Sequence, residues 1–173
     1  MPKFNVCLIN DSFPPEIDGV ANAVTNYAQI ITEKFGNAVV VTPDNPEADD
    51  SVYPFPVVRY PSVDMTKLVG YRAGFPFSAA VQKTLEAGNF DIIHSHCPIT
   101  STMLARSLRD RINVPVVMTY HTKFDIDIAN AIRGKLLQEE AKALLAANIS
   151  ACDEVWTVSR GAGENLRAIG YEG

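Results

Sequence analysis

The sequence lacks the features that mark secreted, membrane-spanning or metal-thiolate proteins. Its 173 residues contain three cysteines, Cys7, Cys97 and Cys152, at spacings that match neither a disulfide framework nor a CxxC metal site. No apolar run reaches the ~20 residues that a membrane helix needs. The N-terminal run MPKFNVCLIN is broken by two asparagines and resembles a first strand, not a signal peptide. A cytoplasmic protein with reduced thiols is therefore expected.

The chain also lacks an excess of positive charge. It has 15 Lys and Arg against 20 Asp and Glu, which gives a net charge of −5. Proteins that bind nucleic acid need a basic surface to neutralise phosphates, so nucleic acid is not expected as a partner. No GxGxxG turn of a dinucleotide-binding domain is present either.

Short apolar runs alternate with helical patterns along the whole chain. This alternation predicts parallel βαβ units and a Rossmann-like, doubly wound, mainly parallel α/β sheet in one domain over residues 1–173. Runs such as 38–41 are apolar throughout, which is typical of strands buried on both faces. The expected strands are 4–9, 38–41, 57–60, 91–96, 115–120 and 154–158, and the expected helices are one that ends at Gly36 and four more at 77–88, 98–111, 135–150 and 159–170.

Apolar spacing also predicts which faces of two helices are buried. Residues three and four apart lie on the same side of a helix, so a repeat of this kind marks the face toward the core. The predicted buried positions are Val20, Val24, Tyr27 and Ile31 in the first helix, and Leu137, Ala141, Leu144 and Leu145 in the helix 135–150.

Ligands of such sheets bind beyond the carboxyl ends of the strands, so the residues that follow each strand are the candidates for function. After the first strand, Asp18 is expected to cap the next helix, and Gly19 lies at its N-terminus. Free amides and the helix dipole favour an anion there. An ordinary turn, in which Gly19 only permits close packing, remains an equal alternative.

His94 and His96 end the strand 91–96. Because side chains alternate along a strand, both rings are expected on one face. An HxH pair can bind zinc, which makes a metal-dependent hydrolase, or another stand-alone ligand-binding α/β domain, the alternative function. Zinc needs three or four ligands, however, and the only other histidine is His121. A contact to a ligand or a hydrogen bond in the core is favoured over metal binding.

His121 follows the strand 115–120 and is the candidate catalytic residue, because a polar ligand at the sheet edge would contact it. Lys123 adds a cation suited to a phosphate. Thr119 and Ser159 lie at the ends of neighbouring strands and complete the set of candidate substrate contacts.

Three segments together resemble a known family. FPPEIDGVANAV, DIIHSHCP with PVVMTYHT, and DEVWTVSRGAGENLRAIG are similar to the N-terminal half of retaining GT-B glycosyltransferases of family 4. Within the family, TYHTKFD resembles enzymes that glucosylate diacylglycerol or mannosylate phosphatidylinositol. The family's usual Gly-Gly is reduced here to Gly19 followed by Val20.

The resemblance implies the roles of several residues. Gly19, with Asp18 beside it, would approach the diphosphate of a UDP- or GDP-sugar donor, His121 would lie beside the transferred sugar, and His96 would support the site. It further implies transfer of a hexose with retention, no metal or other cofactor, an acceptor that is a sugar or a lipid, and a C-terminal nucleotide-sugar-binding domain that is absent from this chain.

The segment 67–77 combines Lys67 and Arg72 with several large apolar side chains and no acid. For Phe75 and Phe77 taken alone, packing onto the core is the simpler expectation. Basic and apolar groups together also suit an anionic bilayer, at about 1 kcal/mol per basic residue. Peripheral contact with the inner face of a membrane is therefore expected through this segment, sensitive to salt because the net charge opposes it.

Overall fold

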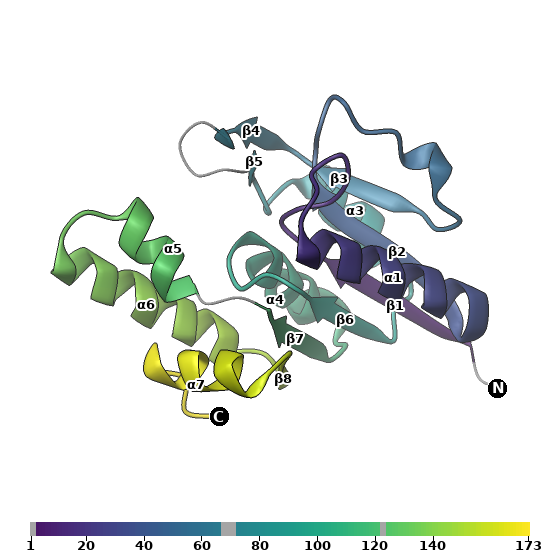
Figure 1. Ribbon diagram of the computed structural model, residues 1–173. Coiled ribbons are helices and arrows are strands. Elements are labelled where there is room, and N and C mark those ends of the chain that lie inside the picture. Colours follow the sequence, from purple (N-terminus) through teal and green to yellow (C-terminus); the bar gives the residue numbers. More distant parts are fainter. Residues whose placement is uncertain (1–2, 67–71, 122–123) are drawn as a thin grey trace.

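The computed structural model describes residues 3–66, 72–121 and 124–173, and its centre is a parallel sheet (Figure 1). Six strands pair in the order β3-β2-β1-β6-β7-β8. All neighbours are parallel, so the carboxyl ends of the strands meet at one edge. The predicted α/β doubly wound fold is confirmed. The strands are β1 (Phe4–Ile9), β2 (Gly36–Pro43), β3 (Val57–Tyr60), β6 (Ile92–Ser95), β7 (Val116–Tyr120) and β8 (Glu154–Thr157).

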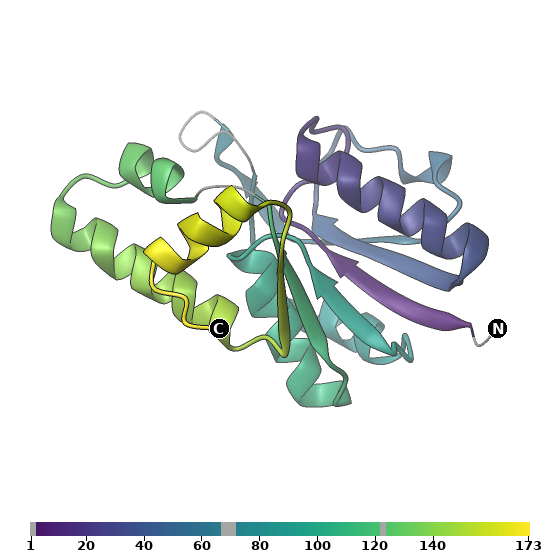
Figure 2. The same ribbon diagram turned by 60° about the horizontal axis from the view of Figure 1, so that its bottom comes forward.

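Helices cover both faces of the sheet (Figure 2). Helix α1 (Gly19–Lys34) lies on one face, and α3 (Ala79–Glu86) and α4 (Thr100–Ile112) lie on the other. The last three helices gather at the β8 end of the sheet in both views. They are α5 (Phe124–Ala131), α6 (Lys135–Ser150) and α7 (Arg160–Ala168).

Alternate residues of the inner strands supply two separate cores. In β1, Leu8 packs toward α1, whereas Cys7 and Ile9 pack toward α3 and α4. All three side chains are fully buried. Burial on both faces explains why these strands are apolar at successive positions, as parallel strands between two helical layers must be.

Four small elements were not predicted. An antiparallel pair, β4 (Ser62–Asp64) with β5 (Arg72–Gly74), stands apart from the main sheet, and helix α5 and a 3-10 turn, η1 (Asp50–Val52), also form. Strands of three residues are too short for a periodicity to show. Gly74 makes the β5 position possible, because a Cβ there would lie 2.2 Å from the ring of Tyr60.

The predicted buried faces of two helices are partly wrong. In α1 the fully buried residues are Ala21, Val24 and Ala28, while Tyr27 is half exposed. Small alanines allow the helix to lie close to the sheet, and the large ring of Tyr27 projects beside it. In α6, Leu137 and Leu144 are exposed, and the buried residues are Leu145, Ala146 and Ile149.

Truncation of neighbouring leucines in α6 should reveal this register. Leu145 is 7% exposed and contributes to the core around Met118, whereas Leu144 is 71% exposed. Leu145→Ala should lower the free energy of unfolding by about 2–4 kcal/mol because a cavity remains. Leu144→Ala should change it by no more than about 0.5 kcal/mol. Urea titrations followed by circular dichroism measure both, and equal losses would show that the helix faces the core differently.

Candidate functional site

The carboxyl edge of the sheet carries most of the predicted site residues. Asp18 ends the loop after β1 and Gly19 begins α1, His96 directly follows β6, and His121 directly follows β7. The His96 amide still donates to the Ile9 carbonyl at 2.9 Å, so its backbone is held by the sheet. Ser159 follows β8 at the same edge.

All three histidines of the chain form one cluster, called here the histidine cluster. The ring centroids of His94 and His96 are 4.0 Å apart, which confirms that they share a face. His96 Nδ1 lies 3.0 Å from His121 Nε2, a hydrogen bond between the two rings. His94 Nε2 is 2.7 Å from the Thr119 hydroxyl. The cluster thus runs from the interior of the sheet to its edge.

Two half-exposed aromatic rings border the cluster. The ring of Tyr27 lies 5.7 Å from that of His94 and 5.4 Å from that of His96, measured between centroids. Trp156 of β8 meets His94 edge-on at 5.4 Å. Tyr27 is half exposed because its ring packs against His94 and His96 and not into the core.

Burial keeps the histidine cluster neutral. It lowers the pKa of His94 to about 4 and that of His96 well below the ordinary value of 6.5. Burial also lowers the pKa of His121, but the Asp18 carboxylate opposes this effect. The Asp18 carboxylate thus acts electrostatically on His121, although the two residues are far apart in the sequence. A neutral imidazole at the edge can donate or accept a hydrogen bond.

The turn that carries Asp18 and Gly19 has the predicted cap. One carboxylate oxygen of Asp18 accepts from the amides of Val20 and Ala21, both at 2.7 Å. Gly19 is exposed, and a Cβ there would meet nothing within 4 Å. Because Asp18 already satisfies two amides of the helix, a phosphate at this turn would have to approach the Gly19 backbone beside a carboxylate.

Asp11 is an important residue that sequence reasoning did not select. Its buried carboxylate accepts from the Ser101 amide at 2.7 Å, the Thr100 amide at 3.1 Å and the Tyr60 hydroxyl at 3.2 Å, and from the Ser101 hydroxyl. Burial raises the pKa of Asp11, and hydrogen bonds from Cys97 and Ser101 oppose that rise. Asp11 joins the loop after β1 to the first turn of α4. The strand-end rule that selected His121 would also have identified it.

Arg59 anchors the same loop from the other side. Its guanidinium binds both carboxylate oxygens of Asp50 at 2.8 Å and donates to the carbonyls of Pro43 and Pro14 at 2.9 and 2.8 Å. Only 10% of the Arg59 side chain is exposed, so these contacts replace water almost completely. The loop that delivers Asp18 is thus fixed from two directions.

The other candidates have different environments. Thr119 is buried beneath the edge and bonded to His94, so it supports the histidine cluster from inside. Ser159 is exposed and caps α7 through Ala162. Arg72 Nε donates to the Asp44 carbonyl and the Ser62 hydroxyl. Lys123 and Lys67 lie outside the described residues.

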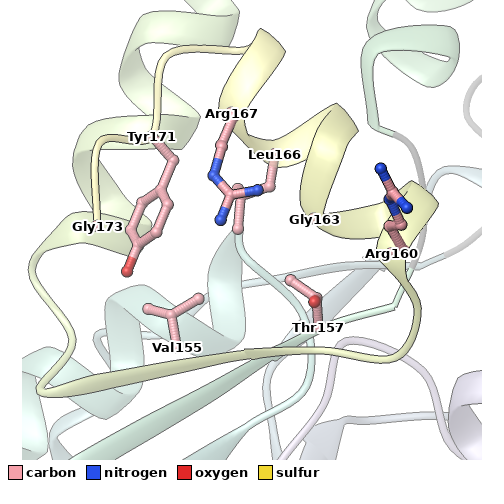
Figure 3. Close-up of a pocket in the computed structure, with 8 residues that line it drawn as sticks. All are labelled: Val155, Thr157, Arg160, Gly163, Leu166, Arg167, Tyr171 and Gly173. Carbon is pink, nitrogen blue, oxygen red and sulfur yellow. The ribbon is translucent and has the colours of Figure 1, made fainter.

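A hollow of about 310 Å³ lies elsewhere, between β8 and α7 (Figure 3). Val155 and Thr157 of β8 line one side, and Leu166, Arg167 and Tyr171 line the other. It contains none of the predicted site residues. We therefore assign the candidate site to the polar residues at the carboxyl edge and not to this hollow.

The metal alternative is not favoured. Within the described ranges, no three His, Cys, Asp or Glu side chains gather as a set of metal ligands. One ring nitrogen of His94 is already hydrogen-bonded to Thr119, and one of His96 to His121.

In the described part of the chain, no helix combines the length and apolar character needed to cross a bilayer.

The low pKa of His94 predicts a loss of stability in acid. The unfolded chain takes up a proton near pH 6.5 and the folded chain only near pH 4, so unfolding binds protons between these values. The free energy of unfolding should fall by about 3 kcal/mol from this group as pH drops from 7 to 4. Urea titrations at several pH values measure the fall. His94→Gln, which cannot be protonated, should show a smaller one, and an identical pH dependence would contradict the assignment.

Comparisons with known proteins find glycosyltransferases among the relatives of this chain. An alpha-monoglucosyldiacylglycerol synthase from Streptococcus pneumoniae is 22% identical over 131 residues, covering 76% of this chain and 30% of that protein. A GDP-mannose-dependent alpha-mannosyltransferase from Corynebacterium glutamicum is 25% identical over 120 residues, covering 68% and 29%. The chain thus spans a little under a third of the length of these relatives.

A solved structure supports the fold. A protein from Listeria monocytogenes described as a UDP-N-acetylglucosamine 2-epimerase superposes with a TM-score of 0.54 at 16% identity, over 99% of this chain and 44% of its own. At that identity the likeness concerns the fold alone. The family is shown by a separate match that covers residues 17–173. The chain belongs to Glycosyltransferase Family 4.

Proposed function

We propose that this chain is the acceptor-side part of a retaining glycosyltransferase, which transfers a hexose from a UDP- or GDP-sugar to an acceptor hydroxyl. The family match over residues 17–173 carries the proposal. The position of His121 at the carboxyl edge, directly after β7, supports it, because ligands of doubly wound sheets bind at that edge. A C-terminal domain would supply the nucleotide pocket, in keeping with the greater length of the relatives.

Transfer in this proposal occurs on one face of the sugar. The bond between the anomeric carbon and the diphosphate breaks, the acceptor oxygen bonds to that carbon, and the leaving diphosphate takes the proton of the acceptor hydroxyl. His121 orients the sugar by a hydrogen bond. A preorganised donor of this kind stabilises a transition state without needing to reorganise. The reaction needs no metal or other cofactor in this proposal.

We propose a glycerolipid as the acceptor. One relative is named for the synthesis of a glucosylated diacylglycerol. Phe75 and Phe77 are exposed, contrary to the simpler expectation, and pack edge-on against each other at 6.0 Å. The Phe75 amide donates to the Pro61 carbonyl just beyond β3, which puts this apolar pair at the same edge as His121. A lipid held there would bring its hydroxyl toward the site.

Removal of the His121 ring should separate catalysis from folding. In the proposed full-length enzyme, His121→Ala should lower kcat by about 100-fold or more through loss of one oriented donor. The free energy of unfolding should fall by only about 1 kcal/mol, the usual worth of one hydrogen bond. The assay is hexose transfer from labelled donor to diacylglycerol in detergent, with Leu144→Ala as a surface control. Near-normal turnover would show that His121 is structural.

The isolated chain should bind nucleotide-sugars weakly or not at all, because the proposal assigns nucleotide recognition to another domain. Calorimetry with UDP-glucose and GDP-mannose tests this. A dissociation constant of micromolar or below, about −8 kcal/mol of binding free energy, would mean that the nucleotide pocket lies in these 173 residues.

Peripheral membrane contact can be tested by vesicle flotation. The chain should float with phosphatidylglycerol vesicles at low salt and be released at high salt. A Phe75→Ser, Phe77→Ser variant should lose binding, and Lys67→Glu should weaken it about fivefold or more, since a basic residue contributes about 1 kcal/mol. Val52→Ser removes an exposed apolar residue elsewhere and is the matched control. If the wild type does not float at low salt, the membrane proposal is wrong.

A further inference from the structure

The hydrogen bond between His96 and His121 has two possible directions. His96 Nδ1 lies 3.0 Å from His121 Nε2. The other nitrogen of His96, Nε2, is buried and has no hydrogen-bond partner in the described part of the chain, and the residue as a whole is 2% exposed. His121 is less buried, so its Nδ1 is the nitrogen of this pair that remains for a ligand at the carboxyl edge.

We propose that His96 is a positioning residue that holds His121 in the tautomer with its proton on Nδ1. In this arrangement His96 donates its own Nδ1–H to the lone pair of His121 Nε2. His121 then presents an N–H donor at the edge, and the group it recognises is a hydrogen-bond acceptor such as a sugar hydroxyl oxygen. The use of this donor on a sugar rests on the proposed function, whereas the tautomer itself does not.

Neutrality of the two rings makes their tautomers interdependent. Burial lowers the pKa of both His96 and His121, and His94 lowers that of His96 further. A neutral imidazole has one N–H and one lone pair. If His96 donates, both rings carry the proton on Nδ1, and if His121 donates, both carry it on Nε2. The hydrogen bond therefore makes the tautomer of His121 at the edge depend on the tautomer of the buried His96 ring.

The unpartnered Nε2 of His96 favours donation by His96. In the opposite arrangement, the buried Nε2 of His96 would carry an N–H without an acceptor, and orphaned buried N–H groups are rare in proteins.

Nuclear magnetic resonance can read the tautomer directly. The chain has three histidines, so labelling with ¹⁵N-histidine gives three ring systems, which His94→Gln and His121→Ala assign. Two-bond ¹⁵N–¹H couplings then identify the protonated nitrogen of each ring near pH 7. Both His96 and His121 should carry the proton on Nδ1. Protons on Nε2 in both rings, or shifts averaged between the two states, would overturn the proposal.

Substitutions of His96 test whether it causes the tautomer. Asn can place an N–H near the position of Nδ1, whereas Leu cannot donate. His96→Asn should leave the proton of His121 on Nδ1, and His96→Leu should release His121 into a mixture of tautomers. His94→Gln, which alters a neighbouring ring not bonded to His121, is the matched control. If His121 keeps one tautomer in His96→Leu, His96 has no positioning role.

Kinetics of the full-length enzyme separate this inference from the proposed function. His96→Leu should lower kcat about tenfold or more with little change in KM, and His96→Asn should recover most of the loss, because a misplaced imidazole proton impairs catalysis. If the tautomers are as proposed but His121→Ala is fully active, the catalytic use of His121 fails while the positioning by His96 stands. If His96→Asn and His96→Leu lower kcat equally, His96 acts only through packing.

Discussion

The parallel direction of the six strands is the constraint on which the site depends. Parallel strands place all their carboxyl ends at one edge, so residues from distant parts of the sequence meet there. Ile9 of β1 pairs with Ser95 of β6, and Ser95 pairs with Met118 of β7. His96 and His121 consequently leave adjacent strands within hydrogen-bonding distance of each other. A shift of register by one residue would turn one of the rings to the other face.

Buried polar contacts fix the loop after β1, which lies beyond the hydrogen-bonded part of the sheet. The Asp11 carboxylate and the Arg59 guanidinium both leave water, which is costly for charged groups unless hydrogen bonds replace the lost hydration. Asp11 accepts hydrogen bonds from Thr100, Ser101 and Tyr60, and Arg59 makes two to Asp50 and two to backbone carbonyls. The loop that leads to Asp18 is therefore tied to α4 through Asp11 and to β3 through the Pro14 carbonyl.

Sequence patterns predicted the fold well and the site only in outline. The βαβ alternation is a strong signal, because helices repeat apolar residues every three or four positions whereas buried strands are short continuous apolar runs. The contact between His96 and His121 could not be foreseen, since it depends on the register of two strands that are 25 residues apart. The predicted buried face of α1 is partly wrong because alanines carry little hydrophobic weight although Ala21 and Ala28 are fully buried. Leu144 and Leu145 show the same limit, because adjacent leucines leave the phase of a helix ambiguous.

The effects that shift the histidine pKa values differ between the buried rings and the ring at the edge. For His94 and His96 burial dominates and no carboxylate is among the causes that shift their pKa values, so both rings resist protonation. His121 is less buried and feels the Asp18 carboxylate, which works against the effect of burial. Positive charge that develops in the cluster is therefore most favourable on His121, the ring next to the edge. The two inner histidines, kept neutral by burial, are suited to orienting His121 and not to sharing its charge.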